Sequence, residues 1–155
     1  MGDLIFGGAA VWLVVQHSQK ALDVQGAAMN SGAFVQQWTE LKDHNHPNQQ
    51  FTFEDLGNGF YKITARHSGK VLDVGSASTA PGARIIQYDW HGGDNQQFAL
   101  DYADNCIVLR AKHSGLVLDV AGASTQDGAV VQQWNATGQP NQRWYIDSPL
   151  AVAID

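Results

Sequence analysis

The chain has little cysteine, little charge and no long apolar run, and each shortage excludes a class of protein. Its 155 residues include one cysteine, Cys106, so no disulfide can form within the chain and the fold depends on packing. Charged residues make up 15%, with a net charge of -6, which argues against nucleic acid and anionic lipid as partners. No stretch of about 18 apolar residues occurs, so the sequence predicts no membrane-spanning helix.

Proline is also scarce, with four residues against 16 glycines. This balance indicates many short turns rather than a disordered chain. The first residues, Met1 to Phe6, lack the basic start and small-residue cleavage site of a secretory signal. The expectation is therefore cytoplasmic synthesis or release by a non-classical route. Cys106 precedes the apolar Ile107–Leu109, so we expect a buried thiol rather than a reactive one.

One segment, His-Ser-x-x-x-Leu-Asp-Val, occurs three times, at residues 17–24, 67–74 and 113–120. Each copy is followed by an aromatic residue fifteen positions past the aspartate, and then by Asn-Gln-x-aromatic. Repeats at a fixed period are typical of pseudo-symmetric folds. The sequence therefore predicts one domain over residues 1–155, made of three units at about 10–59, 60–105 and 106–150.

Within each unit the apolar residues alternate with polar ones, as expected of half-buried strands. In the first unit the predicted strands cover residues 11–16, 21–24, 34–38 and 50–54, and the other units repeat them. A propeller also uses four strands per unit but usually has at least four blades. Three units of four strands instead predict an all-β protein with the β-trefoil fold, about twelve strands in three pseudo-symmetric units.

Two parts of the chain depart from the repeat. The segment from Thr39 to Pro47 is three residues longer than its counterparts and carries His44 and His46, so we expect a surface loop. The apolar segments at residues 4–6 and 150–154 lie outside the units. They either pair near the joined termini or cover a neighbouring chain, which leaves homo-oligomerisation open.

The repeated aspartate and aromatic residue form the candidate site. In a strand, alternate side chains point to opposite faces, so if Leu22 and Val24 face the core, Asp23 faces outward. By the same alternation Gln36 and Trp38 share a face, opposite Val35. A carboxylate accepts hydrogen bonds from two sugar hydroxyls, and an aromatic ring covers the apolar C–H face of a pyranose. The repeat therefore predicts one saccharide site per unit.

Other interpretations compete for the same residues. An aspartate after a strand can accept backbone N–H groups of a turn, and Gln49, Gln96 and Gln142 are expected to satisfy backbone groups or to orient the aspartates. Histidines 17, 67 and 113 recur, but a turn carbonyl is a simpler partner for each than a shared metal. A His-Ser-Asp triad or a glycosidase carboxylate pair needs a single reaction centre, which three like copies disfavour.

These motifs in register resemble the ricin B-type lectins, a family of carbohydrate-binding β-trefoils, over about residues 10–147. The resemblance implies galactose or N-acetylgalactosamine as the ligand, and no metal, cofactor or catalysis. It also implies two or three shallow sites that act together on glycoproteins or glycolipids of a cell surface, as in an agglutinin. The implied first site comprises Asp23, Gln36, Trp38, Asn48 and Gln49; the second Asp73, Tyr88, Asn95 and Gln96; the third Asp119, Gln132, Trp134, Asn141 and Gln142.

The second unit departs from this pattern. Ile86 stands where the other units have glutamine, Tyr88 replaces tryptophan, and Trp90 stands nearby as an alternative platform. We therefore rank the first and third sites above the second. The main rival function is a protein-binding trefoil, such as a protease inhibitor, that acts through loops like residues 39–47.

Overall fold

A computed structural model describes residues 8–148 and contains twelve strands in this range. Their bounds are β1 Trp12–Val15, β2 Ala21–Val24, β3 Val35–Trp38, β4 Phe51–Asp55, β5 Tyr61–Ala65, β6 Val71–Val74, β7 Ile85–Tyr88, β8 Phe98–Ala103, β9 Cys106–Ala111, β10 Val117–Val120, β11 Val131–Trp134 and β12 Trp144–Asp147. The helical segments described are 3-10 turns: η2 Gln25–Ala27, η3 Pro47–Gln49, η4 Gly75–Ala77, η5 Asp94–Gln96, η6 Ala121–Ala123 and η7 Pro140–Gln142. No helix among the described residues has the length and apolarity to span a membrane.

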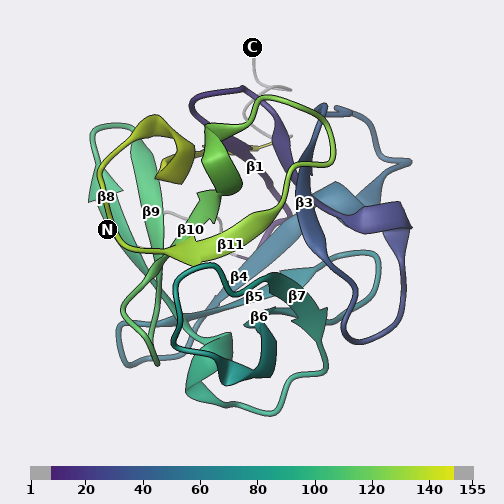
Figure 1. The fold of residues 1–155 in the computed structure, drawn as a ribbon. Coiled ribbons are helices and arrows are strands. Elements are labelled where there is room, and N and C mark those ends of the chain that lie inside the picture. The colour runs from purple at the N-terminus through teal and green to yellow at the C-terminus, as the bar shows by residue number, and fades with distance from the viewer. Residues whose placement is uncertain (1–7, 149–155) are drawn as a thin grey trace.

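Six strands, two from each unit, close into a barrel. β1 pairs with β12, β12 with β9, β9 with β8, β8 with β5 and β5 with β4, all antiparallel. The ring closes between β4 and β1 through reciprocal backbone hydrogen bonds of 2.9 and 2.8 Å between Val11 and Phe51. Figure 1 shows β8 and β9 side by side at one edge of this barrel. Closure leaves none of these six strands as an open sheet edge.

The other six strands form three hairpins, β2–β3, β6–β7 and β10–β11, one from each unit. The hairpins meet through single bridges between units, Phe34 to Ile86, Gln36 to Val130 and Arg84 to Gln132. Figure 1 shows β6 and β7 as one such hairpin at the lower edge of the view. This arrangement of barrel and cap is the β-trefoil, so the predicted fold class is confirmed.

The core is built from equivalent residues of the three units. Leu22, Leu72 and Leu118 are fully buried or nearly so, as are the residues that close each unit, Phe51, Phe98 and Trp144. Burying one such side chain contributes roughly 1.5–3 kcal/mol. The apolar face of every hairpin is therefore held on the barrel, and its other face is available for a site.

The expected strands agree with the observed ones to within one residue at most ends, and β2 matches the expected range of 21–24. Residues 39–46 form a loop without a strand, as the insertion predicted. Cys106 is buried, as expected. The segments at residues 4–6 and 150–154, for which two roles were left open, lie outside the described residues.

Candidate functional site

Each candidate site lies on one hairpin and is set by strand register. Asp23 pairs with Gln36 across β2–β3, and Trp38 pairs with Ala21 two residues further along. Because alternate residues share a face, the carboxylate and the ring are diagonal neighbours on it. The third hairpin has the same register, with Asp119 opposite Gln132 and Val117 opposite Trp134.

The alternation predicted that the three aspartates face the solvent. This prediction is wrong, because Asp23, Asp73 and Asp119 are only 4%, 3% and 4% exposed. Amide side chains cover them. Around Asp23, Gln36 Nε2 donates to Oδ1 at 3.0 Å, and Gln49 Nε2 and Asn48 Nδ2 donate to Oδ2 at 3.0 and 3.4 Å. The predicted face of the strand is correct, but the aspartate forms the floor of a hollow on that face.

The same network surrounds Asp119. Gln132 donates to Oδ1 at 3.0 Å, while Gln142 and Asn141 donate to Oδ2 at 2.9 and 3.3 Å. Asp73 has two amide donors, Asn95 at 3.2 Å and Gln96 at 2.9 Å. The glutamine donor found opposite the other aspartates is missing here because Ile86 occupies that register position.

Burial raises the pKa of Asp23 and of Asp73 above the usual carboxyl value, and the hydrogen bonds from Gln49 and Gln36, or from Gln96, oppose the rise. For Asp73, the nearby His91 and Asn95 also lower the pKa. The donors therefore partly offset the cost of holding a carboxylate in a buried position. An ionised carboxylate fixed in this way is an acceptor, and it selects ligand groups that donate hydrogen bonds.

The three rings are exposed, which excludes a core role for them. Trp38, Tyr88 and Trp134 are 39%, 42% and 40% exposed. A Cβ placed on Gly128 of the third unit would lie 3.9 Å from the Trp38 ring, and one on Gly82 of the second unit 3.9 Å from the Trp134 ring. Both glycines have positive φ angles, +91° and +96°, which other residues rarely adopt. Glycine in the neighbouring unit thus permits the turn that lies beside each tryptophan.

Two of the sites form distinct hollows, of about 520 and 440 Å³, within the range of small-ligand pockets. The first hollow is lined by Asp23, Gln25, Gly26, Ala27, Gln36, Trp38, Leu41, His46 and Asn48. The second is lined by Asp73, Ser76, Ala77, Ile86, Tyr88, His91 and Asn95. In both, the aspartate and the aromatic residue predicted to act together line the same hollow.

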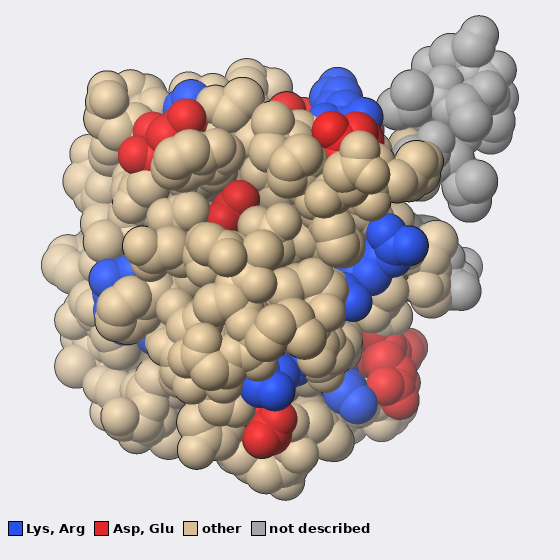
Figure 2. All heavy atoms as spheres, turned by 90° about the vertical axis from the view of Figure 1, so that its right-hand side faces the viewer, with Lys and Arg blue, Asp and Glu red and all other residues tan. Residues whose placement is uncertain are grey.

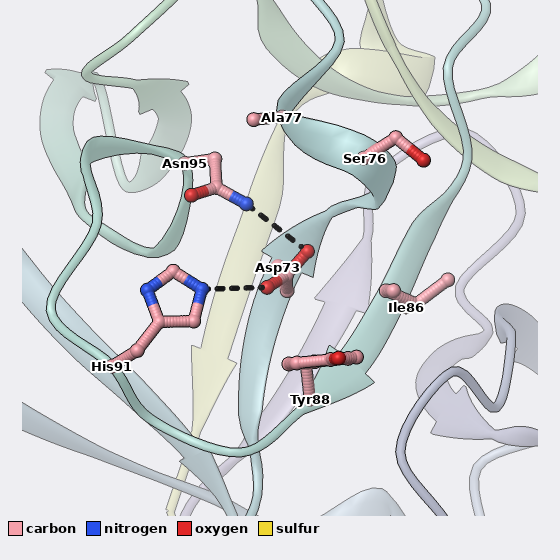
Figure 3. Close-up of a pocket in the computed structure, with 7 residues that line it drawn as sticks. All are labelled: Asp73, Ser76, Ala77, Ile86, Tyr88, His91 and Asn95. Atoms are coloured by element: carbon pink, nitrogen blue, oxygen red, sulfur yellow. Dashed lines mark hydrogen bonds and ion pairs between the residues drawn. The ribbon is translucent and has the colours of Figure 1, made fainter.

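Figure 3 shows the second hollow, with Asp73 near its centre between Asn95, His91 and Tyr88. His91 Nδ1 accepts the backbone N–H of Gly93 at 3.0 Å, and His91 Nε2 lies 4.0 Å from Asp73 Oδ2. Tyr88 and His91 meet edge to face with ring centroids 6.2 Å apart. Trp90, considered as an alternative platform, does not line this hollow; Lys62 Nζ lies 4.8 Å from its ring centroid.

Comparison with known proteins identifies the family. The description "Ricin-type beta-trefoil lectin domain-like" matches residues 47–134 and 94–153, which together cover more than half of the chain. A designed threefold-symmetric protein, ThreeFoil, is 49% identical with a TM-score of 0.86, over 90% of this chain and 98% of its own. The chain belongs to the ricin-type β-trefoil lectin family.

Other similar proteins are longer or more distant. An exo-β-1,3-galactanase from Clostridium thermocellum is 35% identical over 90% of this chain, with a TM-score of 0.84, but the match spans only 30% of the enzyme. The clotting factor G alpha subunit of Tachypleus tridentatus is 48% identical over 48 residues, which are 31% of this chain and 7% of that protein. A lectin from Macrolepiota procera, solved with lactose, shares the fold at 22% identity and a TM-score of 0.77, over 92% of this chain and 96% of its own. Family membership and the geometry of the hollows together support carbohydrate binding.

The repeated motifs did not identify several residues that line the hollows. Leu41 and His46 enter the first hollow from the inserted loop, and Ser76 and His91 line the second. The turn η2 also lines the first hollow, with positive φ angles at Gly26 and Ala27. Its counterparts η4 and η6 follow Asp73 and Asp119 with the same geometry. The turn position was visible in the repeat as residues three and four past each aspartate.

The glutamines behind each aspartate do both of the things expected of them. Gln49 Nε2 donates to Asp23 and also to the carbonyl of Thr39, and its Oε1 accepts the N–H of Leu41. Gln96 and Gln142 make the same three kinds of contact. These residues are buried, so they position the aspartate and the preceding loop rather than contact a ligand.

The repeated histidines bond backbone carbonyls, as the simpler interpretation predicted, and each of these carbonyls belongs to another unit. His17, His67 and His113 lie 2.7, 2.7 and 2.6 Å from carbonyl oxygens of Ser124, Ala28 and Ser78. Each serine that follows them donates to a glutamine, as Ser18 does to Gln37 at 2.9 Å. His17 and Ser18 are therefore not arranged as a catalytic pair. Among the described residues, no group of three or more His, Cys, Asp or Glu is placed to hold a metal.

Nothing in the sequence predicted the role of the buried glutamines that these serines contact. Gln37 Nε2 donates to the carbonyls of Ser124 and Gln126, both at 2.8 Å. Gln87 and Gln133 make the equivalent bonds to the first and second units. Each hairpin thus holds a loop of another unit. For the first and third hairpins, this loop also carries the glycine that lies next to the tryptophan of the hairpin.

Proposed function

We propose that this chain is a lectin that binds galactose-type glycans, with galactose or N-acetylgalactosamine as the terminal sugar, at two or three repeated sites. The observation that carries the proposal is the pairing of a buried, amide-held carboxylate with an exposed ring on one hollow, as Asp23 is paired with Trp38. The carboxylate accepts hydroxyl groups, and the ring takes the C–H face of the pyranose. The chain acts by binding, without catalysis.

Galactose is favoured because it presents both features on one ring. The hydroxyl groups of galactose are oriented differently from the equatorial hydroxyl groups of glucose. This orientation leaves an apolar C–H patch on galactose that an aromatic ring can cover. The similar proteins agree with this choice: the Macrolepiota procera lectin was solved with lactose, which contains galactose, and the Clostridium thermocellum enzyme is a galactanase.

Single-site affinity is expected to be weak, on the order of 0.1–1 mM, because a monosaccharide offers few atoms for contact. Sites engaged together on a dense glycan surface raise apparent affinity by about 10²–10⁴. Charged residues make up only 15% of the chain. On the face seen in Figure 2, the acidic and basic side chains are scattered singly or in mixed groups. Binding should therefore depend weakly on salt.

A glycan array followed by competition with free galactose tests the proposal. We expect binding to galactose-terminated glycans that galactose displaces at millimolar concentration and that glucose displaces less well. Binding that galactose never displaces would contradict the sugar assignment. Absence of binding to every glycan would contradict the lectin function itself.

A further inference from the structure

The three sites share a floor but differ at one wall position. The backbone N–H groups of Leu41, His91 and Thr137 each donate to the Oε1 atom of a buried glutamine, at 2.9, 2.9 and 2.8 Å. The Nε2 atom of the same glutamine donates to the aspartate of that site, at 3.0, 2.9 and 2.9 Å. We call these three residues the wall position. Their backbone N–H groups lie in the same place relative to the carboxylate of each site.

The side chain at the wall position differs in kind between the sites. Leu41 and His91 line the first and second hollows. In the first hollow, Leu41 adds to the apolar surface of Ala27 and Trp38. In the second, His91 brings a polar edge: because its Nδ1 accepts from Gly93, the ring proton is on Nε2, which is directed at Asp73 (Figure 3).

N-acetylgalactosamine differs from galactose by an acetamido group in place of one hydroxyl. The methyl of that group gains free energy against an apolar surface, whereas a hydroxyl gains from a hydrogen-bond donor. We propose that the wall position contacts this substituent and sets which sugar each site prefers. The first site, with Leu41, selects N-acetylgalactosamine, and the second, with His91, accepts galactose at least as well. This inference rests on the proposed function and assigns different ligands within it.

Variants with one working site test the inference. Asp73→Asn with Asp119→Asn leaves the first site, and Asp23→Asn with Asp119→Asn leaves the second, with side chains of unchanged size. For each, titration by NMR gives the ratio of affinities for N-acetylgalactosamine and galactose. Burying one methyl group corresponds to about a fourfold change in affinity. We expect a ratio of about 4 or more at the first site and about 1 or less at the second.

Exchanging the wall residues sharpens the test. Leu41→His should lower the ratio at the first site to that of the second, and His91→Leu should raise the second to that of the first. Leu41→Met, which keeps an apolar wall, should leave the ratio unchanged, and Leu41→Thr should reduce it. In a variant that keeps only the third site, Thr137→Leu should raise the ratio about fourfold.

A second measurement avoids the aspartate substitutions. In the unaltered protein, the side-chain amide resonances of Gln49 and Gln96 report the first and second sites separately, so each titration yields a site-resolved ratio. Equal ratios at the two sites, or ratios that do not respond to the exchanges, would overturn the inference while leaving the lectin function intact. If the unaltered protein binds neither sugar, the proposed function and the inference both fail.

Discussion

The first and second sites have a common floor and different walls. In both, a buried aspartate is fixed by an asparagine and a glutamine that follow it by about 22–26 residues. The first site adds Gln36 as a third amide donor, Trp38 as its platform and a longer loop; the second has Ile86, Tyr88 and His91. The aspartate, the asparagine and the glutamine are common to both sites, whereas the residue opposite the aspartate, the exposed ring and the loop differ between them.

The largest expected effect comes from removing the floor. Asp23→Ala deletes the charged acceptor on which the first site depends, and a hydrogen bond to a charged group is worth roughly 1.5–3 kcal/mol. Sugar binding at the first site should fall more than about tenfold, while the second and third sites keep theirs. Site-resolved NMR titration with galactose measures this, and Asp73→Ala is the matched variant for the second site. Unchanged binding in both variants would show that the carboxylates do not contact the sugar.

Removing the platform should cost less than removing the floor. Trp38→Ala takes away an aromatic contact worth about 0.5–1.5 kcal/mol beyond its buried area, so affinity at the first site should fall roughly three- to tenfold. Tyr88→Ala should have the smaller effect because the phenol ring covers less of the sugar. Tryptophan fluorescence during titration provides an independent readout, since only the first and third sites carry tryptophan as the platform. A larger loss for Tyr88→Ala than for Trp38→Ala would reverse the proposed order of the sites.

Exchanging the residue opposite the aspartate tests the difference in floor hydrogen bonds. Ile86→Gln should give Asp73 the third donor that Asp23 has, and Gln36→Ile should remove it from Asp23. One hydrogen bond is worth about 0.5–1.5 kcal/mol, so we expect affinity changes of roughly two- to tenfold, in opposite directions at the two sites. Isothermal titration of single-site variants measures both. A loss of affinity in both would indicate that Ile86 itself contacts the ligand.

The smallest effect concerns the loop that is longer at the first site than at the other two. Glu40, which is 11% exposed, lies beside Asp147, and burial together with a hydrogen bond to Asp147 raises the pKa of Glu40 from 4.5 to about 7. Lys42 Nζ lies 3.9 Å from Glu40 and 3.7 Å from Asp147 and opposes the rise. Since the folded state holds this proton and the unfolded chain releases it, the free energy of unfolding should decrease as pH rises from about 4.5 to 7.

Glu40→Gln removes that ionisation. The variant should be more stable than the unaltered protein at pH 8, by on the order of 1 kcal/mol after solvent screening, and nearly equal to it at pH 4. Urea unfolding at the two pH values measures the difference, with Glu54→Gln, an exposed carboxylate on β4, as the control. An equal effect of Glu40→Gln at both pH values would contradict the raised pKa of Glu40.

Most of the fold was predictable because the same sequence pattern occurs in each of the three units. Three copies of Leu-Asp-Val predicted the strand and its buried face, and Asp23, Trp38 and Asn48 were predicted as site residues because their spacing recurs. The sequence could not show that Asp23 is buried, since alternation gives only the face of a strand and not what covers that face. Nor could it identify Leu41 or His91, because their roles depend on side chains of Gln49 and Gln96 that reach back to the loop. Contacts between units, such as Gln37 with the loop at Ser124, carry no local signal at all.

A crystal structure of the protein with bound galactose would show whether the aspartates and the exposed rings form the sugar sites. We expect one sugar in the first hollow, with hydroxyls donating to Asp23 and its C–H face on Trp38, and a second in the Asp73 hollow beside Tyr88. Galactose bound at a different surface, with Asp23, Asp73 and Asp119 all free of contact, would contradict this expectation.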